Sequence, residues 1–248
     1  MRTLLVGLAT GFALCQLGTL VTTVHLHRAL SHRSLTLAPG ARWAFRALTW
    51  VLTGIRPRQW VAVHRRHHAF TDVEGDPHSP LLEGFAMVQF ANVALYRRAA
   101  RDPEVARYAR DLPPDRWDRW LFDHAVVGLG LGVALLVVVL GPAVAAVAAA
   151  FHTASYLLVN AAVNAVGHRF GRQPHDNTAR NNQWLAWLTA GEGLHNNHHA
   201  APTSARLSLA RGEVDPGWWV VGALERRGWA TIRHHTPRIR TAPAREAA

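Results

Sequence analysis

The sequence predicts an all-α membrane protein with about three spanning helices, further helices at the membrane interface, and a cytoplasmic helical cap carrying a histidine-rich site for two metal ions. We expect a single integral-membrane domain over residues 1–248. Three apolar segments lie near the roughly 20 residues that a spanning helix needs. Nine of the 16 histidines fall in four short stretches of a chain that is 49% hydrophobic and 17% charged. These two observations predict the fold class and the site.

The three expected spans are at about residues 4–24, 125–140 and 143–163. Gly141 and Pro142 separate the last two, which predicts a tight helical hairpin. The first segment has the position of a signal peptide, but it lacks a convincing cleavage site and leads directly into a histidine group. We therefore interpret it as a retained helix.

A fourth apolar stretch, at about residues 43–63, is expected to lie in the membrane interface. It carries three arginines, a glycine and a proline, which are costly at bilayer depth. If it crossed the bilayer, His32 and His64 would face opposite compartments and could not share a metal. An amphipathic element with its apolar face in lipid avoids this conflict. We expect the same of residues 85–96, and a short helix and turn at 102–118.

The composition favours a membrane over nucleic acid as the partner of this chain. The 27 basic residues are all arginine and the formal net charge is +11. The arginines are scattered and flank apolar segments, which favours the positive-inside rule over nucleic-acid binding. With three crossings, all the histidine groups lie on the arginine-rich, cytoplasmic side of the cell (inner) membrane, and the N-terminus lies outside. One cysteine, Cys15, excludes a disulfide framework and a thiolate metal site. The tail at about 236–248 is expected to be flexible.

The histidine groups are HRALSH, HRRHH, NAVGH and HNNHH. Positions i, i+3 and i+4 share one helical face, so HRRHH and HNNHH each present three imidazoles on one side. The two histidines of HRALSH are five apart, about 140° on an ideal helix, which predicts that they straddle a helix end. One ion takes about four to six ligands, so nine imidazoles predict two ions held close together. The candidate ligands are His27, His32, His64, His67, His68, His168, His195, His198 and His199.

Simpler interpretations exist for single motifs. One HxxHH could be a solvated helix face or a zinc site, but two of them beside HxxxxH favour a metal pair. Imidazole ligands alone do not select the metal, since zinc, iron and copper all accept them. The other histidines are expected to be packing or interface residues: His25, His124, His152, His175, His234 and His235.

The order and spacing of the four groups resemble the membrane-bound fatty acid (acyl-CoA) desaturase family, in particular the bacterial Δ9 desaturases. The flanking sequences strengthen the resemblance: PRQWVAVHRRHHAFTDVEGDPHSP, DPEVARYARDLPPDRWDRW, GEGLHNNHHAAPTSAR and EVDPGWW. It covers about residues 5–232. Each box alone is moderately specific, and the ordered set with these flanks is strongly so.

The resemblance implies roles for individual residues. The nine histidines match those that hold two iron ions (Fe2+) in the family, and Asn164 matches an asparagine that reaches one metal through a water. Trp60 matches a tryptophan near the bound acyl chain. Glu192, in the GEG motif, is a candidate acceptor that orients the box histidines, with helix capping as the alternative. His78, in the DPH motif, is read as structural.

The resemblance also implies the activity: O2-dependent desaturation of a saturated fatty acyl chain, carried by CoA or lipid, by a non-haem diiron centre. The double bond is expected at Δ9. Two electrons would come from an external carrier, either ferredoxin, rubredoxin or a cytochrome b5-like protein with its reductase. Arg56, Arg58 and Arg65 are candidates for the charged headgroup. Relatives usually have four spans, and the segment before HRALSH matches the second. We therefore expect either that the start of the sequence is trimmed or that this member has three spans.

Three rival functions remain open from the residues. A hydroxylase or other oxidase could use the same diiron scaffold. A non-enzymatic metal-binding or metal-exporting membrane protein would need ionisable residues inside its spans, and these carry few besides His152. A structural membrane protein would leave the histidine clustering without a cause.

Overall fold

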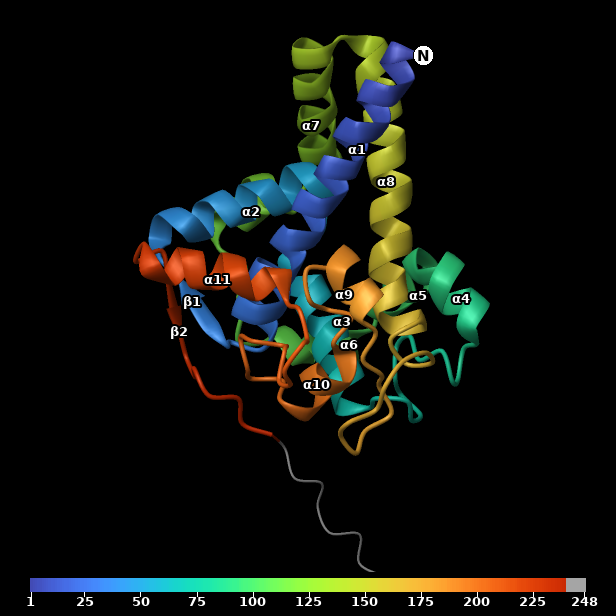
Figure 1. The fold of residues 1–248 in the computed structure, drawn as a ribbon. Coiled ribbons are helices and arrows are strands. Elements are labelled where there is room, and N and C mark those ends of the chain that lie inside the picture. Colours follow the sequence, from blue (N-terminus) through green and yellow to red (C-terminus); the bar gives the residue numbers. More distant parts are fainter. Residues whose placement is uncertain (240–248) are drawn as a thin grey trace, which may run out of the picture.

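The computed structural model describes residues 1–239 and is mostly helical (Figure 1). Long helices form the upper part of the molecule and shorter ones form a cap below them. The predicted flexible tail lies outside the described residues from position 240 onward. The elements, in chain order, are α1 (Arg2–Val21), η1 (Thr22–Ser31), β1 (Leu35–Leu37), α2 (Pro39–Thr53), α3 (Pro57–Ala69), α4 (Phe85–Phe90), α5 (Asn92–Ala100), α6 (Pro103–Ala106), η2 (Arg107–Ala109), η3 (Asp118–Phe122), α7 (Ala125–Leu140), α8 (Pro142–Ala165), α9 (Gln183–Leu188), α10 (His195–Ala200), α11 (Pro216–Arg226) and β2 (Ala230–Ile232).

Two of the three expected spans have the length and composition to cross a bilayer. They are Arg2–Ser31, which joins α1 to η1, and Pro142–Ala165. Helix α7 is equally apolar but has only 16 residues, so a three-span arrangement stays a prediction. The hairpin is confirmed, because α7 ends at Leu140 and α8 begins two residues later. Gly141 makes the turn with φ +79°, a left-handed conformation that favours glycine.

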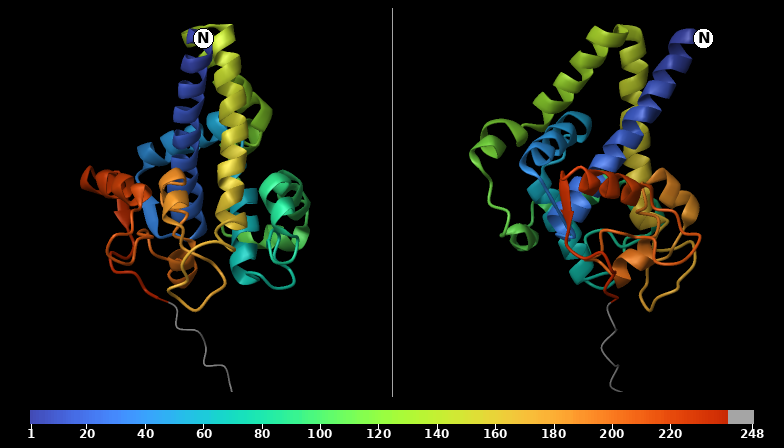
Figure 2. Two further views of the ribbon diagram at one scale, coloured as in Figure 1. Left: turned by 45° about the vertical axis from the view of Figure 1, so that its right-hand side comes forward. Right: turned by 60° about the vertical axis from the view of Figure 1, so that its left-hand side comes forward.

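Small residues let α1 and α8 approach closely. A Cβ atom on Gly7 would lie 2.6 Å from Val147 Cβ, and one on Gly11 would lie 2.7 Å from the carbonyl oxygen of Ala148. Spacing of small residues by four is typical of close packing between membrane helices. The two helices are in contact, side by side in the left view of Figure 2 and crossing at an angle in the right view.

The first helix continues beyond its predicted end, and its last part changes register. Residues Thr22–Ser31 form a π-helix, and the His32 amide donates to the His27 carbonyl, five residues back, at 3.1 Å. A bond from i to i+5 closes one turn between these residues. The two histidines therefore lie on one side of the helix, whereas an α-helix would separate them by about 140°.

The stretch predicted as one interfacial element is two helices. Helix α2 ends at Gly54, where φ is +62°, and α3 begins at Pro57. Helix α2 packs across α7, with the Trp50 indole donating to the His124 carbonyl at 3.0 Å. Helix α3 turns into the cap, where α6 and η2 of the predicted 102–118 segment pack against it. Its N-terminal proline is compatible with a helix start.

A short antiparallel sheet joins the chain after η1 to the C-terminal region. Leu35 pairs with Ile232 and Leu37 with Ala230. Their side chains pack with Val24 of η1 in one apolar cluster, which Trp218 and Leu224 of α11 cover. The sheet and this cluster hold α11 beside η1, although nearly 200 residues separate them along the chain. These strands were not predicted from the sequence.

The α1–α8 contact gives the first testable prediction. Replacing Gly11 with leucine would force the helices apart, because its Cβ has no room. Overpacking of this kind costs about 1–3 kcal/mol, so the unfolding temperature of the protein in detergent should fall. Gly130→Leu is the matched control, since nothing lies within 4 Å of a Cβ at that position. Equal melting of the two variants would contradict the packing described.

Candidate metal centre

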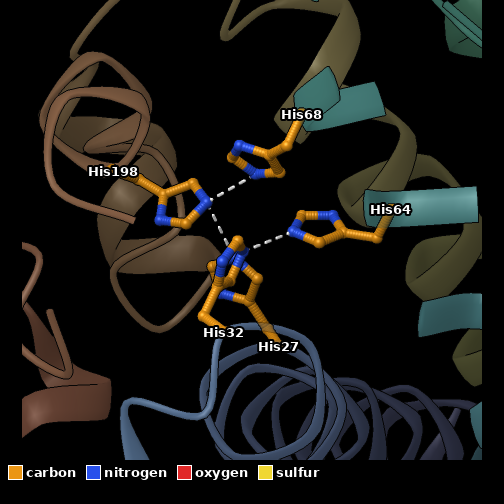
Figure 3. A group of neighbouring side chains, drawn as sticks. All are labelled: His27, His32, His64, His68 and His198. Carbon is orange, nitrogen blue, oxygen red and sulfur yellow. Dashed lines mark hydrogen bonds between the residues drawn. The ribbon is translucent and has the colours of Figure 1, made fainter. Parts of the chain in front are cut away.

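Five histidines from three separate elements form the first group of the centre. η1 supplies His27, the residue directly after η1 is His32, α3 supplies His64 and His68, and α10 supplies His198 (Figure 3). One ring nitrogen of each lies within 4.8 Å of those of all the others. The Nε2–Nε2 distances are 2.8 Å for His32–His64, 2.9 Å for His68–His198 and 3.0 Å for His27–His198.

A second group of four histidines lies against the first. It consists of His67 on α3, His168 just after α8, and His195 and His199 on α10. The Nε2 atoms of His195 and His199 are 3.2 Å apart. The ring of His199 stacks on that of His68, with centroids 4.4 Å apart, so the groups adjoin. The structure thus brings together all nine histidines singled out from the sequence.

The nitrogen spacing fits atoms that share an ion. If two nitrogens each lie about 2.1 Å from one ion and the angle between them at the ion is about 90°, they lie about 3 Å apart. The short Nε2–Nε2 contacts, 2.8–3.2 Å, match this separation.

Three carboxylates accept from the outward-facing nitrogens of these rings. Glu192 lies 2.7 Å from His27 Nδ1, Asp72 lies 2.7 Å from His168 Nδ1, and Asp76 lies 2.9 Å from His67 Nδ1. Such contacts fix the tautomer, so that Nδ1 carries the proton and Nε2 faces the centre.

These carboxylates stay ionised although they are buried. Burial opposes the ionisation of Asp72, Asp76 and Glu192, but the neighbouring histidines outweigh it and lower the pKa of each carboxyl. For Glu192, His27 and Arg28 both contribute. The predicted contact between Glu192 and a box histidine is therefore present.

Burial keeps most of the imidazoles neutral. It lowers the pKa of five histidines well below 6.5, and the mutual repulsion of the clustered rings lowers it further. Neutral imidazole is the form that binds metals. The five are His64, His68, His195, His198 and His199.

Helix α10 is buried over its full length, and the two asparagines between its histidines hold it in place. The Asn196 amide donates to the Ala179 carbonyl at 3.0 Å. The Asn197 amide donates to the Leu207 carbonyl at 2.9 Å and to Glu213 at 2.7 Å. These bonds fix the helix from both flanking loops, so that its three histidines point at the centre.

The other predicted site residues lie around the two groups. Trp60, one turn before His64, stacks on that ring with centroids 4.8 Å apart and planes at 10°. Asn164 lies one turn before His168 near the end of α8. The ring of His78 lies 4.8 Å from that of His67, and burial lowers the pKa of His78 to about 3. Together with Asp76 it forms a third, smaller cluster around His67.

Asp72 was not among the predicted site residues. It lies four residues after His68, has φ +59°, and receives 2.5 Å and 2.7 Å contacts from Ser79 and His168. The signal in the sequence was an acidic residue shortly after a histidine box, and only the acid of the DPH motif was interpreted in that way.

A cavity of about 440 Å³ opens next to η1, the element that carries His27. It is lined by His25 and Leu30 of η1, by arginines from α2 and the start of α3, and by the loop over residues 111–123. Arg56 and Arg58 line this cavity. Arg65 does not, because its guanidinium donates to the carbonyls of Leu30 and Ser31 and to Asp111.

Comparisons with known proteins identify the family of this chain. The family model for fatty acid desaturases matches residues 3–231. An acyl-CoA 5-desaturase of Anemone leveillei is 38% identical over 234 residues, covering 90% of this chain and 69% of the relative. A delta-9 desaturase-like protein of Arabidopsis thaliana is 32% identical, covering 89% and 74%. A sn-1 stearoyl-lipid 9-desaturase of Synechocystis is 30% identical, covering 86% and 67%. The resemblance is confirmed: the chain belongs to the fatty acid desaturase family, whose members are oxidoreductases.

Proposed function

We propose that this protein is an O2-dependent fatty acyl desaturase with a non-haem pair of iron ions. The observation that carries the proposal is the convergence of nine histidines in two adjoining groups, five and four, in the cap at one end of the long helices (Figure 1). The family match supports the reaction class, and the geometry of the groups supports the number of ions.

The residues fit a metal pair. His67 Nε2 and His168 Nε2 are buried and have no hydrogen-bond partner among the described residues, although the Nδ1 atom of each is bound to a carboxylate. A buried unpaired nitrogen is costly, and an ion would satisfy both atoms. Imidazoles suit zinc, copper and iron. Zinc has no redox chemistry, so iron fits an oxidation.

The two ions would be held by separate sets. The five-histidine group would hold one ion, and the four-histidine group would hold the other, with Asn164 completing the second set through a water. When bound, the iron pair supplies the redox chemistry with O2 that removing hydrogen from an unactivated C–H bond requires. All remaining functions fall to the chain itself.

The chain orients its ligands and excludes water. Glu192, Asp72 and Asp76 fix three rings, and burial of α10 keeps solvent from the centre. Trp60 is proposed to contact the acyl chain, because it stacks on His64 at the edge of the five-histidine group. A fixed substrate carbon beside the ions would gain the rate advantage of a pre-oriented reaction.

The acyl headgroup is proposed to bind in the arginine-lined cavity. Arg42 and Arg58 have no carboxylate partner among the described residues, whereas Arg46 is paired with Asp115 and Asp118. The cavity reaches His25 and Leu30, which flank His27 along the chain. We propose that an anionic headgroup binds at the mouth of this cavity, with the acyl chain running from there toward the centre.

Substrate and partners are proposed by class. Two of the relatives above are named for position 9 and one for position 5, and the two names that state an acyl carrier give CoA and lipid. We propose Δ9 desaturation of an acyl-CoA or acyl-lipid. Two electrons would come from ferredoxin, rubredoxin or a cytochrome b5-like protein. The arginines of the cap support a position on the cytoplasmic face of the cell membrane.

The proposed activity is tested by expression in a host that lacks its own desaturase. With iron and a reductase supplied, total lipid should gain a double bond at C9, read by mass spectrometry. His64→Ala should abolish the product, because it removes one ligand, whereas His234→Ala, outside both groups, should leave it unchanged. Hydroxylated instead of unsaturated chains would reject desaturation.

The metal-free protein should lose stability as the pH falls from 7 to 5. Five histidines are kept neutral when folded and become protonated below about pH 6.5 when unfolded. The unfolded state then binds more protons, and each histidine subtracts up to about 1.4 kcal/mol per pH unit. Thermal unfolding in detergent measures this. A melting temperature that does not change over this range would contradict the burial of the centre.

The headgroup site predicts a change in KM rather than in kcat. Arg58→Ala should raise KM for an acyl-CoA by at least about tenfold, since one charge-assisted hydrogen bond is worth about 1.5–3 kcal/mol and each step of about 1.4 kcal/mol is a factor of ten. The turnover number should change less than twofold, because the centre is untouched. Arg97→Ala, on the exposed side of α5, is the control and should alter neither constant. An unchanged KM in Arg58→Ala would place the headgroup elsewhere.

A further inference from the structure

A buried arginine lies directly beside a histidine of the centre. Arg28 is 1% exposed and has the largest of the fully buried side chains. One of its terminal nitrogens, Nη2, donates to Asp215 Oδ1 at 2.9 Å, and the other, Nη1, donates to Thr23 Oγ1 at 3.0 Å. Burying an ion pair costs several kcal/mol per ion unless its geometry is good. Because an apolar pair would fill this space without that cost, we expect the Arg28–Asp215 pair to have a role besides packing.

Two glycines make room for this ion pair. A Cβ on Gly217 would lie 2.1 Å from Arg28 Nη1, and one on Gly191 would lie 2.2 Å from Asp215 Oδ1. Gly191 also has φ +103°. Asp215 accepts from the amides of Leu207 at 2.7 Å and Trp218 at 2.9 Å, so it caps α11 as well. The first glycine of GEG and the glycine of PGWW are thus explained by one buried contact.

The network continues from Arg28 to His27. The Thr23 hydroxyl has one proton, and because Arg28 donates to its oxygen, that proton is free to reach Glu192 Oε1. The same carboxylate oxygen accepts from His27 Nδ1 at 2.7 Å. The direction of each hydrogen bond is therefore fixed: Arg28 donates to Thr23, and both Thr23 and His27 donate to Glu192. His27 Nε2 is left with its lone pair facing His198 at 3.0 Å.

We propose that Arg28, acting through Thr23, is a positioning residue that holds Glu192 as the acceptor for His27 and so fixes the tautomer and direction of that ring. The proposal rests on the proposed metal pair. Because His27 belongs to the five-histidine group, the network serves one of the two ions. The other group has its own carboxylates, Asp72 and Asp76, which are held by Ser79 and by backbone amides.

The test is a cobalt titration of the purified, metal-free full chain in detergent, followed by visible absorption. Thr23→Val removes the hydroxyl while leaving the Arg28–Asp215 pair. It should weaken one of two bound Co2+ ions by about 10- to 100-fold, the usual cost of losing such an outer contact, and alter only that ion's spectrum. Thr23→Ser should restore both. Thr22→Val is the matched control, because Thr22 bonds Tyr156 and Gly18 instead.

The outcomes separate the two proposals. If wild type binds fewer than two cobalt ions, the metal pair itself fails, and the positioning role fails with it. If wild type binds two and Thr23→Val binds both as tightly, or weakens both equally, the positioning role alone is overturned. Should Thr23→Val not fold, Arg28→Lys, which keeps a charge beside Asp215, is expected to show the same selective loss.

Discussion

The structure depends on four chain segments that meet in the cap, at one end of the long helices. The five-histidine group needs η1, α3 and α10, and the four-histidine group needs the end of α8 as well. Clustered cations would repel one another, and burial removes the water that could screen them. The arrangement is stable only if the imidazoles stay neutral, and neutral rings are those that bind an ion. The same condition thus serves the fold and the proposed chemistry.

Much of the surrounding architecture serves to aim these rings. The π-register of η1 brings His27 and His32 to one side, and the asparagines of HNNHH tie α10 to both of its loops. The two-stranded sheet carries α11 back to η1. This return places Asp215 opposite Arg28. Elements that look peripheral in the sequence are therefore part of the support for the centre.

The sequence predicted the parts that follow from periodicity and spacing. The i, i+3, i+4 pattern placed three histidines on a face of α3 and three on α10, and the Gly141–Pro142 pair marked the hairpin. The π-helix could not be predicted in this way, since its residues read as an ordinary helix end. The Arg28–Asp215 pair joins positions 187 residues apart, and no local pattern signals such a contact. Roles as metal ligands stay predictions for all nine histidines.

Anomalous X-ray diffraction at the iron edge, from crystals of the iron-loaded protein, tests the central claim most directly. The account predicts two iron peaks per chain, one surrounded by His27, His32, His64, His68 and His198 and the other by His67, His168, His195 and His199. A single peak, or iron bound away from these two groups, would contradict it.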